Sequence, residues 1–156
     1  MQKMTRRQWL LRSGTAALTP IFLSSCRPGS ISRDVKSVSP RIADAYVPLE
    51  QTGCVACDNC MPCPYGIDIP SNFLFVDRAI DEGKAPGAID SPDFSEKGST
   101  FLSMYENKIP DEAQTQRCIG CGRCSGVCPA GIDIPAQMSK ITALTDVLRS
   151  LRCRQL

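Results

Sequence analysis

CPYGIDIP at residues 63–70 and CPAGIDIP at residues 128–135 are the same eight residues, except that Tyr65 stands against Ala130. Each octapeptide opens on the last cysteine of a run of four. The first run is spaced C-x2-C-x2-C-x2-C-P and the second C-x2-C-x2-C-x3-C-P. The repeat predicts two similar structural units, built on Cys54, Cys57, Cys60 and Cys63 and on Cys118, Cys121, Cys124 and Cys128.

The second run has the spacing of bacterial iron–sulfur proteins. Three thiolates two residues apart on a tight loop can each reach a different iron of a cubane cluster. The fourth cysteine is turned away by the proline that follows it and reaches the other cluster. Because the four positions of both runs are filled, the sequence predicts two [4Fe–4S] clusters.

Other uses of cysteine agree less well with the spacing. A disulfide framework is plausible only for an exported protein, and four cysteines at three-residue steps cannot pair among themselves without strain. Zinc sites favour Cys-x-x-Cys pairs separated by a longer finger, and thiol exchange needs one exposed pair. The chain has 10 cysteines and no histidine, which excludes Rieske centres and Cys-His or Ser-His catalytic dyads.

Each octapeptide is expected to begin a helix, because proline suits the first helical turn. Apolar residues then recur at helical spacing, and no segment alternates like a strand. We expect a Gly/Pro/Ser loop over 83–98 and a short helix over 99–108, so the predicted fold is a mainly α, small helical dicluster ferredoxin with irregular cluster-binding loops. The expected apolar positions are Phe73, Val76 and Ile80 in the first helix, Phe101, Leu102, Met104 and Tyr105 in the short one, and Met138, Ile141, Leu144, Leu148 and Leu151 in the last.

The backbone and apolar residues of the loops are expected to shape the cluster sites. Gly120, Gly122 and Gly126 let the second loop bring N–H groups close to the sulfurs, and Ala56, Asp58 and Asn59 do so less completely in the first. Four isoleucines are expected to keep water away from the clusters: Ile67, Ile69, Ile132 and Ile134.

The first 25 residues have the form of a cleavable signal peptide, with a charged head and a short, mildly apolar stretch interrupted by Pro20. Thr5-Arg6-Arg7-Gln8-Trp9-Leu10 resembles the twin-arginine export motif, with Trp9 where phenylalanine is usual. An ordinary secretory signal is the alternative. Leu23-Ser24-Ser25-Cys26 resembles a lipobox, which predicts lipidation of Cys26, and the alternative is that Cys26 is removed with the leader.

The serine- and proline-rich segment that follows shows no sustained period, so we expect residues 26–47 to form a lipidated tether and residues 48–156 the dicluster domain. The formal charge of +2 belongs to the leader, since residues 27–156 carry 14 basic and 16 acidic side chains. This balance argues against a nucleic-acid partner. The basic end of the last helix, with Arg149, Arg152 and Arg154, is expected to be a solvated face or a favourable contact with the helix dipole.

The stretch from about Pro48 to Leu151 resembles the C-terminal iron–sulfur extension of bacterial ferredoxin-fused aldo/keto reductases and, more broadly, the helical dicluster ferredoxins. The resemblance is carried by Cys60-Met61-Pro62-Cys63-Pro64 with the following Gly66-Ile67-Asp68-Ile69-Pro70, and by the second run with Cys128-Pro129. It implies crosswise ligation: one cluster is held by Cys54, Cys57, Cys60 and Cys128, and the other by Cys118, Cys121, Cys124 and Cys63. Cys153 belongs to neither set and is expected to be an idle thiol.

The reductase part of that family is an eight-stranded barrel, and this chain has neither the length nor the strand–helix alternation for one. The sequence therefore predicts an electron carrier, not an enzyme, with no small-molecule substrate. We expect a protein that is exported across the bacterial inner membrane, is anchored by lipid to a membrane on its periplasmic face, and exchanges electrons with a partner oxidoreductase. The alternatives are an iron–sulfur subunit of a multi-chain oxidoreductase, with an aldo/keto-reductase-like partner as one option, and an iron–sulfur sensor.

Overall fold

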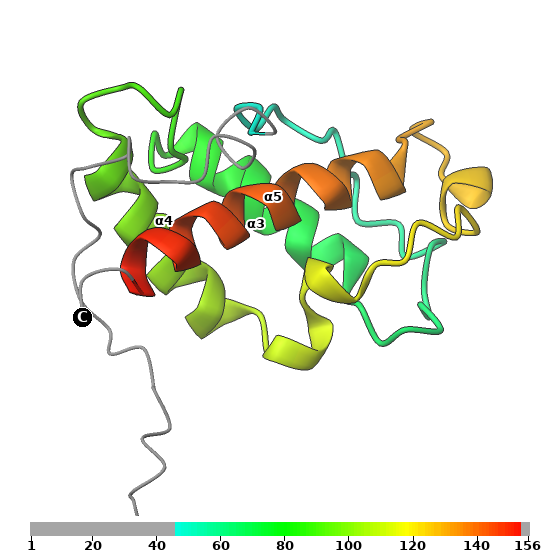
Figure 1. Ribbon diagram of the computed structural model, residues 1–156. Coiled ribbons are helices and arrows are strands. Elements are labelled where there is room, and N and C mark those ends of the chain that lie inside the picture. The colour runs from blue at the N-terminus through cyan, green and yellow to red at the C-terminus, as the bar shows by residue number, and fades with distance from the viewer. Residues whose placement is uncertain (1–45, 154–156) are drawn as a thin grey trace, which may run out of the picture.

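The computed structural model describes residues 46–153 of the 156-residue chain. Three α-helices, α3 (Ile69–Asp81), α4 (Phe94–Lys108) and α5 (Ile134–Cys153), pack together, and the described residues contain no strand. Short 3₁₀ turns, Asp111–Ala113, Thr115–Arg117 and Ser125–Val127, lie between α4 and α5. In Figure 1 the loops with the two cysteine runs lie together at one end of the helical body. The predicted mainly α fold is confirmed.

Helices α3 and α5 begin where the octapeptide repeat predicts. Pro70 and Pro135 are each the second residue of a helix, and an aspartate two residues earlier binds a free backbone N–H of the first turn. The Asp68 carboxylate accepts from Ser71 N at 3.1 Å, and the Asp133 carboxylate accepts from Ala136 N at 3.2 Å. Such side chains offset the missing helical partners of the first N–H groups.

Apolar residues of all three helices form one core, as their helical spacing predicts. Phe73, Val76, Met138 and the leucines of α5 are buried, whereas Ile80 and Met104 are only partly buried. Between α3 and α4 the rings of Phe75 and Phe101 meet edge to face with centroids 5.2 Å apart. Helix α3 ends at Asp81, and Gly83 follows it with a φ of +65°. The loop expected from residue 83 therefore begins close to the observed end of α3.

Helix α4 begins five residues earlier than the expected range of 99–108, so the predicted loop over 83–98 is wrong at its end. Phe94, in its first turn, is fully buried and packs against Tyr46 with ring centroids 5.7 Å apart. Gly98 is buried within the helix, which shows that tertiary packing overrides the weak helical propensity of glycine.

Tyr46 fixes the N-terminal edge of the described structure to the rest of the domain. Its hydroxyl lies 3.1 Å from the Pro86 carbonyl oxygen and 3.0 Å from that of Gly87, and burial raises its pKa to about 12. The packed part of the chain therefore includes Tyr46, within the tether expected over 26–47. The expected signal peptide, Cys26 and most of that tether lie outside the described residues.

The segment that leads from α4 into the second cysteine run is held by buried polar contacts. The Asn72 side chain donates to the carbonyl oxygens of Asp68 and Ala113, at 2.7 and 2.9 Å, and accepts from the Tyr105 hydroxyl. Asn72, Tyr105 and Thr115 are each at most 1% exposed. The network links α3, α4 and the 3₁₀ turns and so fixes where the second run starts.

Candidate metal centre

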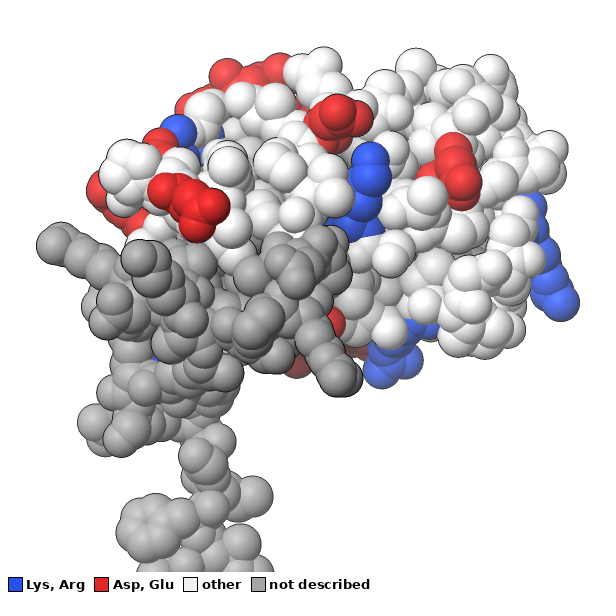
Figure 2. Space-filling model, turned by 45° about the horizontal axis from the view of Figure 1, so that its top comes forward, with Lys and Arg blue, Asp and Glu red and all other residues white. Residues whose placement is uncertain are grey.

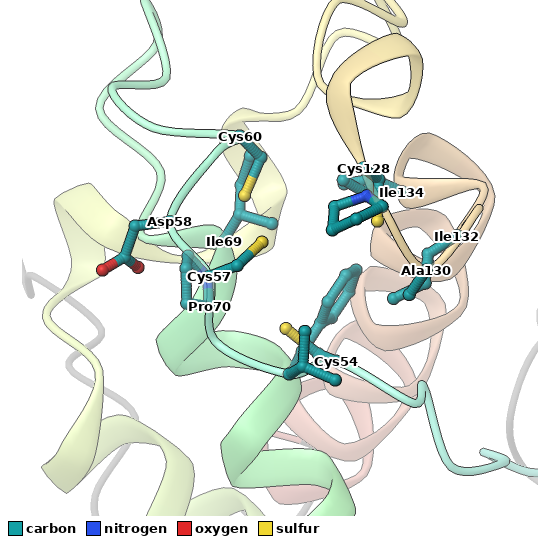
Figure 3. A pocket seen from close by; sticks show the side chains of 13 residues that line it. Cys54, Cys57, Asp58, Cys60, Ile69, Pro70, Cys128, Ala130, Ile132 and Ile134 are labelled. Carbon is teal, nitrogen blue, oxygen red and sulfur yellow. The ribbon is translucent and has the colours of Figure 1, made fainter.

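A small cavity opens between the first cysteine run and the start of α5. Three of its cysteines, Cys54, Cys57 and Cys60, come from the first run, and Cys128 faces them from the second, as Figure 3 shows. Apolar side chains, among them Phe73 and Ile132, line most of the remaining wall, and Asp58 also lines it.

A second small cavity repeats this arrangement with the roles of the runs exchanged. Its cysteines are Cys118, Cys121 and Cys124 from the second run and Cys63 from the first. Both predicted groups of four are thus brought together in space, each around its own cavity.

The octapeptide repeat explains this exchange. After Cys63 and Cys128 the chain makes the same tight turn, closed by Gly66 N to the Cys63 carbonyl oxygen at 3.0 Å and by Gly131 N to that of Cys128 at 3.1 Å. Both glycines have positive φ, +78° and +66°, which glycine adopts without strain. The turn sends each run's last cysteine, and the residues after it, to the other run's cavity.

Two isoleucines, Ile69 and Ile134, line both cavities and therefore form the wall that they share. Both are at most 3% exposed, as is Ile67 in the second cavity. Ile132 is only partly buried. The isoleucines therefore lie beside the cysteines as expected from the sequence, and they form an apolar wall on the inner side of each cavity.

The two cysteine loops share their backbone pattern in spite of different residues. Ala56 and Asp58 have φ of +51° and +58°, and the residues at the same places in the second run, Gly120 and Gly122, have +70° and +72°. The first loop thus holds two non-glycine residues in the left-handed region, at a cost of order 1–2 kcal/mol each. Gly126 is not in this region, so the conformation of this loop does not require glycine there.

The cysteines influence one another's ionisation within and between the runs. Burial raises the pKa of Cys54, and the neighbouring Asp77, Cys128 and Cys57 raise it further. Burial likewise raises the pKa of Cys124, and Cys118 and Cys121 add to the effect. Several thiolates in apolar surroundings need a compensating positive charge, which iron supplies because it binds the deprotonated form.

Four thiolates per site are the donor set that a four-iron cluster uses. Among residues 46–153, no three histidine, cysteine, aspartate or glutamate side chains converge as the ligands of one metal ion do. Each thiolate of a four-iron cluster binds a different iron, so the ligands stand farther apart than the four sulfurs of a zinc site. All eight cysteines of the runs are free thiols, and Cys57 and Cys121 are exposed.

Sequence reasoning missed two polar residues beside the first cavity. The Asp77 carboxylate accepts from Thr52 N at 2.6 Å and from the Thr52 hydroxyl at 2.8 Å, and that hydroxyl accepts from Cys54 N at 3.2 Å. Aligning the sequence after the two octapeptides would have singled out Asp77, because Thr142 occupies the same place in the second half. Cys153 is the last residue of α5.

Residues 53–133, a little over half of the chain, match the family described as 4Fe-4S dicluster domain. No curated protein and no solved structure matches the chain.

Proposed function

Because the chain belongs to the 4Fe-4S dicluster domain family, we propose that it is an exported, membrane-tethered electron-transfer protein that carries two [4Fe–4S] clusters. The domain and its eight cysteines fit two such clusters. A bound cluster supplies one-electron chemistry, since it gains or loses one electron without a change of ligands.

The observation that carries this proposal is the pair of four-cysteine cavities that share a wall. In each, three cysteines are partly buried and one, Cys57 or Cys121, is exposed. The apolar wall shields each cluster, and the exposed cysteine leaves one edge near the surface. Such an arrangement lets electrons enter and leave with no substrate site.

We assign the ligands crosswise, with Cys54, Cys57, Cys60 and Cys128 on one cluster and Cys118, Cys121, Cys124 and Cys63 on the other. The grouping of these side chains around the two cavities supports this assignment. The exchange of the fourth ligand ties both loops into one body, which a small domain needs because its core is limited.

Export and lipid anchoring rest on the N-terminal sequence. Arg6 and Arg7 would direct the folded, cluster-loaded protein to the twin-arginine route, and lipidation at Cys26 would hold it on the periplasmic side as a membrane-anchored lipoprotein. Within residues 46–153, no helix combines the length and apolar character needed to cross a membrane. Attachment through more than one acyl chain is stable, whereas a single chain is marginal.

A second candidate, the iron–sulfur subunit of a larger oxidoreductase, is favoured by exposed apolar residues beside the ligands. Val55, next to Cys54, is 68% exposed, and Ile119, next to Cys118, is 64% exposed. On the face drawn in Figure 2, lysine and arginine side chains are scattered singly and not gathered into a patch. A partner that docks at Val55 and Ile119 would make apolar contacts with them.

The test is anaerobic purification of the full chain, with iron, acid-labile sulfide and zinc measured on the same sample. We expect about eight irons and eight sulfides per chain, two cubanes at four each. Iron near four per chain, or stoichiometric zinc, would contradict the proposal. Proteins that co-purify in fixed ratio would favour the subunit, and a chain isolated alone with both clusters would favour the carrier.

A further inference from the structure

The octapeptide repeat gives a one-to-one correspondence between the two halves of the domain. Counting from the prolines at 70 and 135, Asp77 on α3 corresponds to Thr142 on α5. Both residues hold the segment that enters a cysteine run. Asp77 accepts two hydrogen bonds from Thr52, two residues before Cys54, and Thr142 bonds the Thr115 hydroxyl at 2.9 Å, three residues before Cys118.

The two anchors have the same role but different charges. Thr52 is 9% exposed, and its hydroxyl connects the Asp77 carboxylate to the backbone N–H of Cys54. The contact at Thr142 joins two neutral hydroxyl groups. Only the first half therefore has a carboxylate at this position, and that carboxylate also contributes, after burial, to the raised pKa of Cys54.

The two cysteine loops also differ in charge, and the first loop is again the more negative. Asp58, directly after Cys57, lines the first cavity, and its counterpart in the second loop is Gly122. The next residue is Asn59 in the first loop and Arg123 in the second. All three differences make the surroundings of the first cavity more negative than those of the second.

We propose that Asp77, acting through Thr52, and Asp58 give the cluster held by Cys54, Cys57, Cys60 and Cys128 the lower reduction potential, so that the first electron resides on the other cluster. This inference rests on the proposed function. Reduction adds one negative charge to a cluster, and a nearby carboxylate opposes that addition. Asp77 is partly buried, so solvent and salt screen it less than an exposed carboxylate.

The experiment is a redox titration of the anaerobic full chain with dithionite as the electron donor, followed by electron paramagnetic resonance. The wild type should show two one-electron midpoints. Asp77→Asn keeps an oxygen that accepts from Thr52 but removes the charge, and it should raise the lower midpoint while leaving the higher one unchanged. The reciprocal variant Thr142→Asp should lower the higher midpoint.

Two further variants make the result specific. Glu96→Gln removes an exposed carboxylate from the first turn of α4, at the opposite end of the helical body from the cysteine loops in Figure 1, and should move neither midpoint. Asp58→Asn should raise the same midpoint as Asp77→Asn. If Asp77→Asn does not incorporate its clusters, Asp58→Asn alone tests the inference.

The proposed function and this inference fail in different ways. A wild type without two clusters overturns the function. If the wild type carries two clusters but Asp77→Asn and Asp58→Asn shift the higher midpoint, or shift neither midpoint, the inference is overturned and the proposed function stands. Equal shifts of both midpoints, or a shift with Glu96→Gln, would show only a general charge effect and would likewise overturn it.

Discussion

At the scale of single residues, Cys63 and Cys128 determine how the two halves are joined. Each is the last cysteine of its run, and each lines the cavity formed by the other run. The proline that follows and the turn closed at Gly66 or Gly131 direct the chain away from its own loop. A defect at one of these cysteines should therefore appear at the distant run, not at the neighbouring one.

Replacement of Cys63 by alanine tests this directly. Cys63→Ala should lose the cluster of Cys121 and keep the one of Cys57, so iron should fall from about eight to about four per chain. Its residual electron paramagnetic resonance spectrum should match that of Cys121→Ala and differ from that of Cys57→Ala. Cys153→Ala is the control and should keep both clusters. If the spectrum of Cys63→Ala equals that of Cys57→Ala, the four cysteines of each run bind the same cluster.

Spacing predicts two complete ligand runs because it is a local property, and the crosswise grouping of the cysteines followed from the resemblance to helical dicluster ferredoxins. The same reasoning could not find Asp77, which lies 25 residues from its partner Thr52. Nothing local marks an aspartate on a helix as facing a loop, and only the comparison of the two halves distinguishes it from other acidic residues.

At the scale of elements, α3 and α5 could be predicted because each carries its own start signal and an apolar stripe. Helix α4 was predicted too short, because Pro92 and Gly98 resemble a loop and the burial of Phe94 depends on Tyr46, a residue 48 positions away. Arg149 and Arg152 were expected to form a solvated face or to contact the helix dipole, and the solvated face is wrong because both side chains are partly buried. They pair with Glu106 of α4 at 3.1 and 2.7 Å.

The pair of arginines on Glu106 should stabilise the packing of α4 on α5. Burial works to raise the pKa of Glu106, but hydrogen bonds from Arg152 and Arg149 outweigh it and hold the pKa below its usual value. Glu106→Gln should lower the free energy of unfolding by about 1–2 kcal/mol, because two partly buried guanidinium groups lose their anion. Urea unfolding of the cluster-loaded chain, followed by far-UV circular dichroism, measures the change.

The control for Glu106 is an ion pair at the surface. Glu82 contacts Lys84 at 2.6 Å, but both side chains are more than 40% exposed. Glu82→Gln should therefore leave the unfolding curve unchanged, since water and salt already screen such a pair. If both variants cost the same, the contacts of Glu106 with α5 contribute no more than a surface pair does.

At the scale of the whole molecule, the charge of the chain divides into two parts. Residues 27–156 carry 14 basic and 16 acidic side chains, whereas the first 26 carry four basic and no acidic ones. A positive head next to a mildly apolar stretch is typical of an export signal, and the domain itself needs no such charge to fold. Mutations in the export signal should therefore change where the protein is found without changing the folding of the electron-transfer domain.

Replacing Arg6 and Arg7 together by lysine tests the address. The twin-arginine route carries folded proteins, so the double variant should accumulate in the cytoplasm as a precursor that still holds both clusters. Cell fractionation, with cluster absorbance read in each fraction, measures this. Normal export of the double variant would contradict the twin-arginine assignment, and it would leave the assignment of the eight cysteines untouched.

Replacing Cys26 by alanine tests the anchor independently of the address. If acyl chains on Cys26 hold the protein, Cys26→Ala should either release the cluster-loaded domain from the membrane fraction or block processing of the precursor, because no helix within residues 46–153 can replace the anchor. Cys153→Ala is the matched control, and its membrane attachment should equal that of the wild type. If Cys26→Ala is processed and stays bound to the membrane, lipidation is wrong, and attachment must come from a protein partner, as the subunit alternative requires.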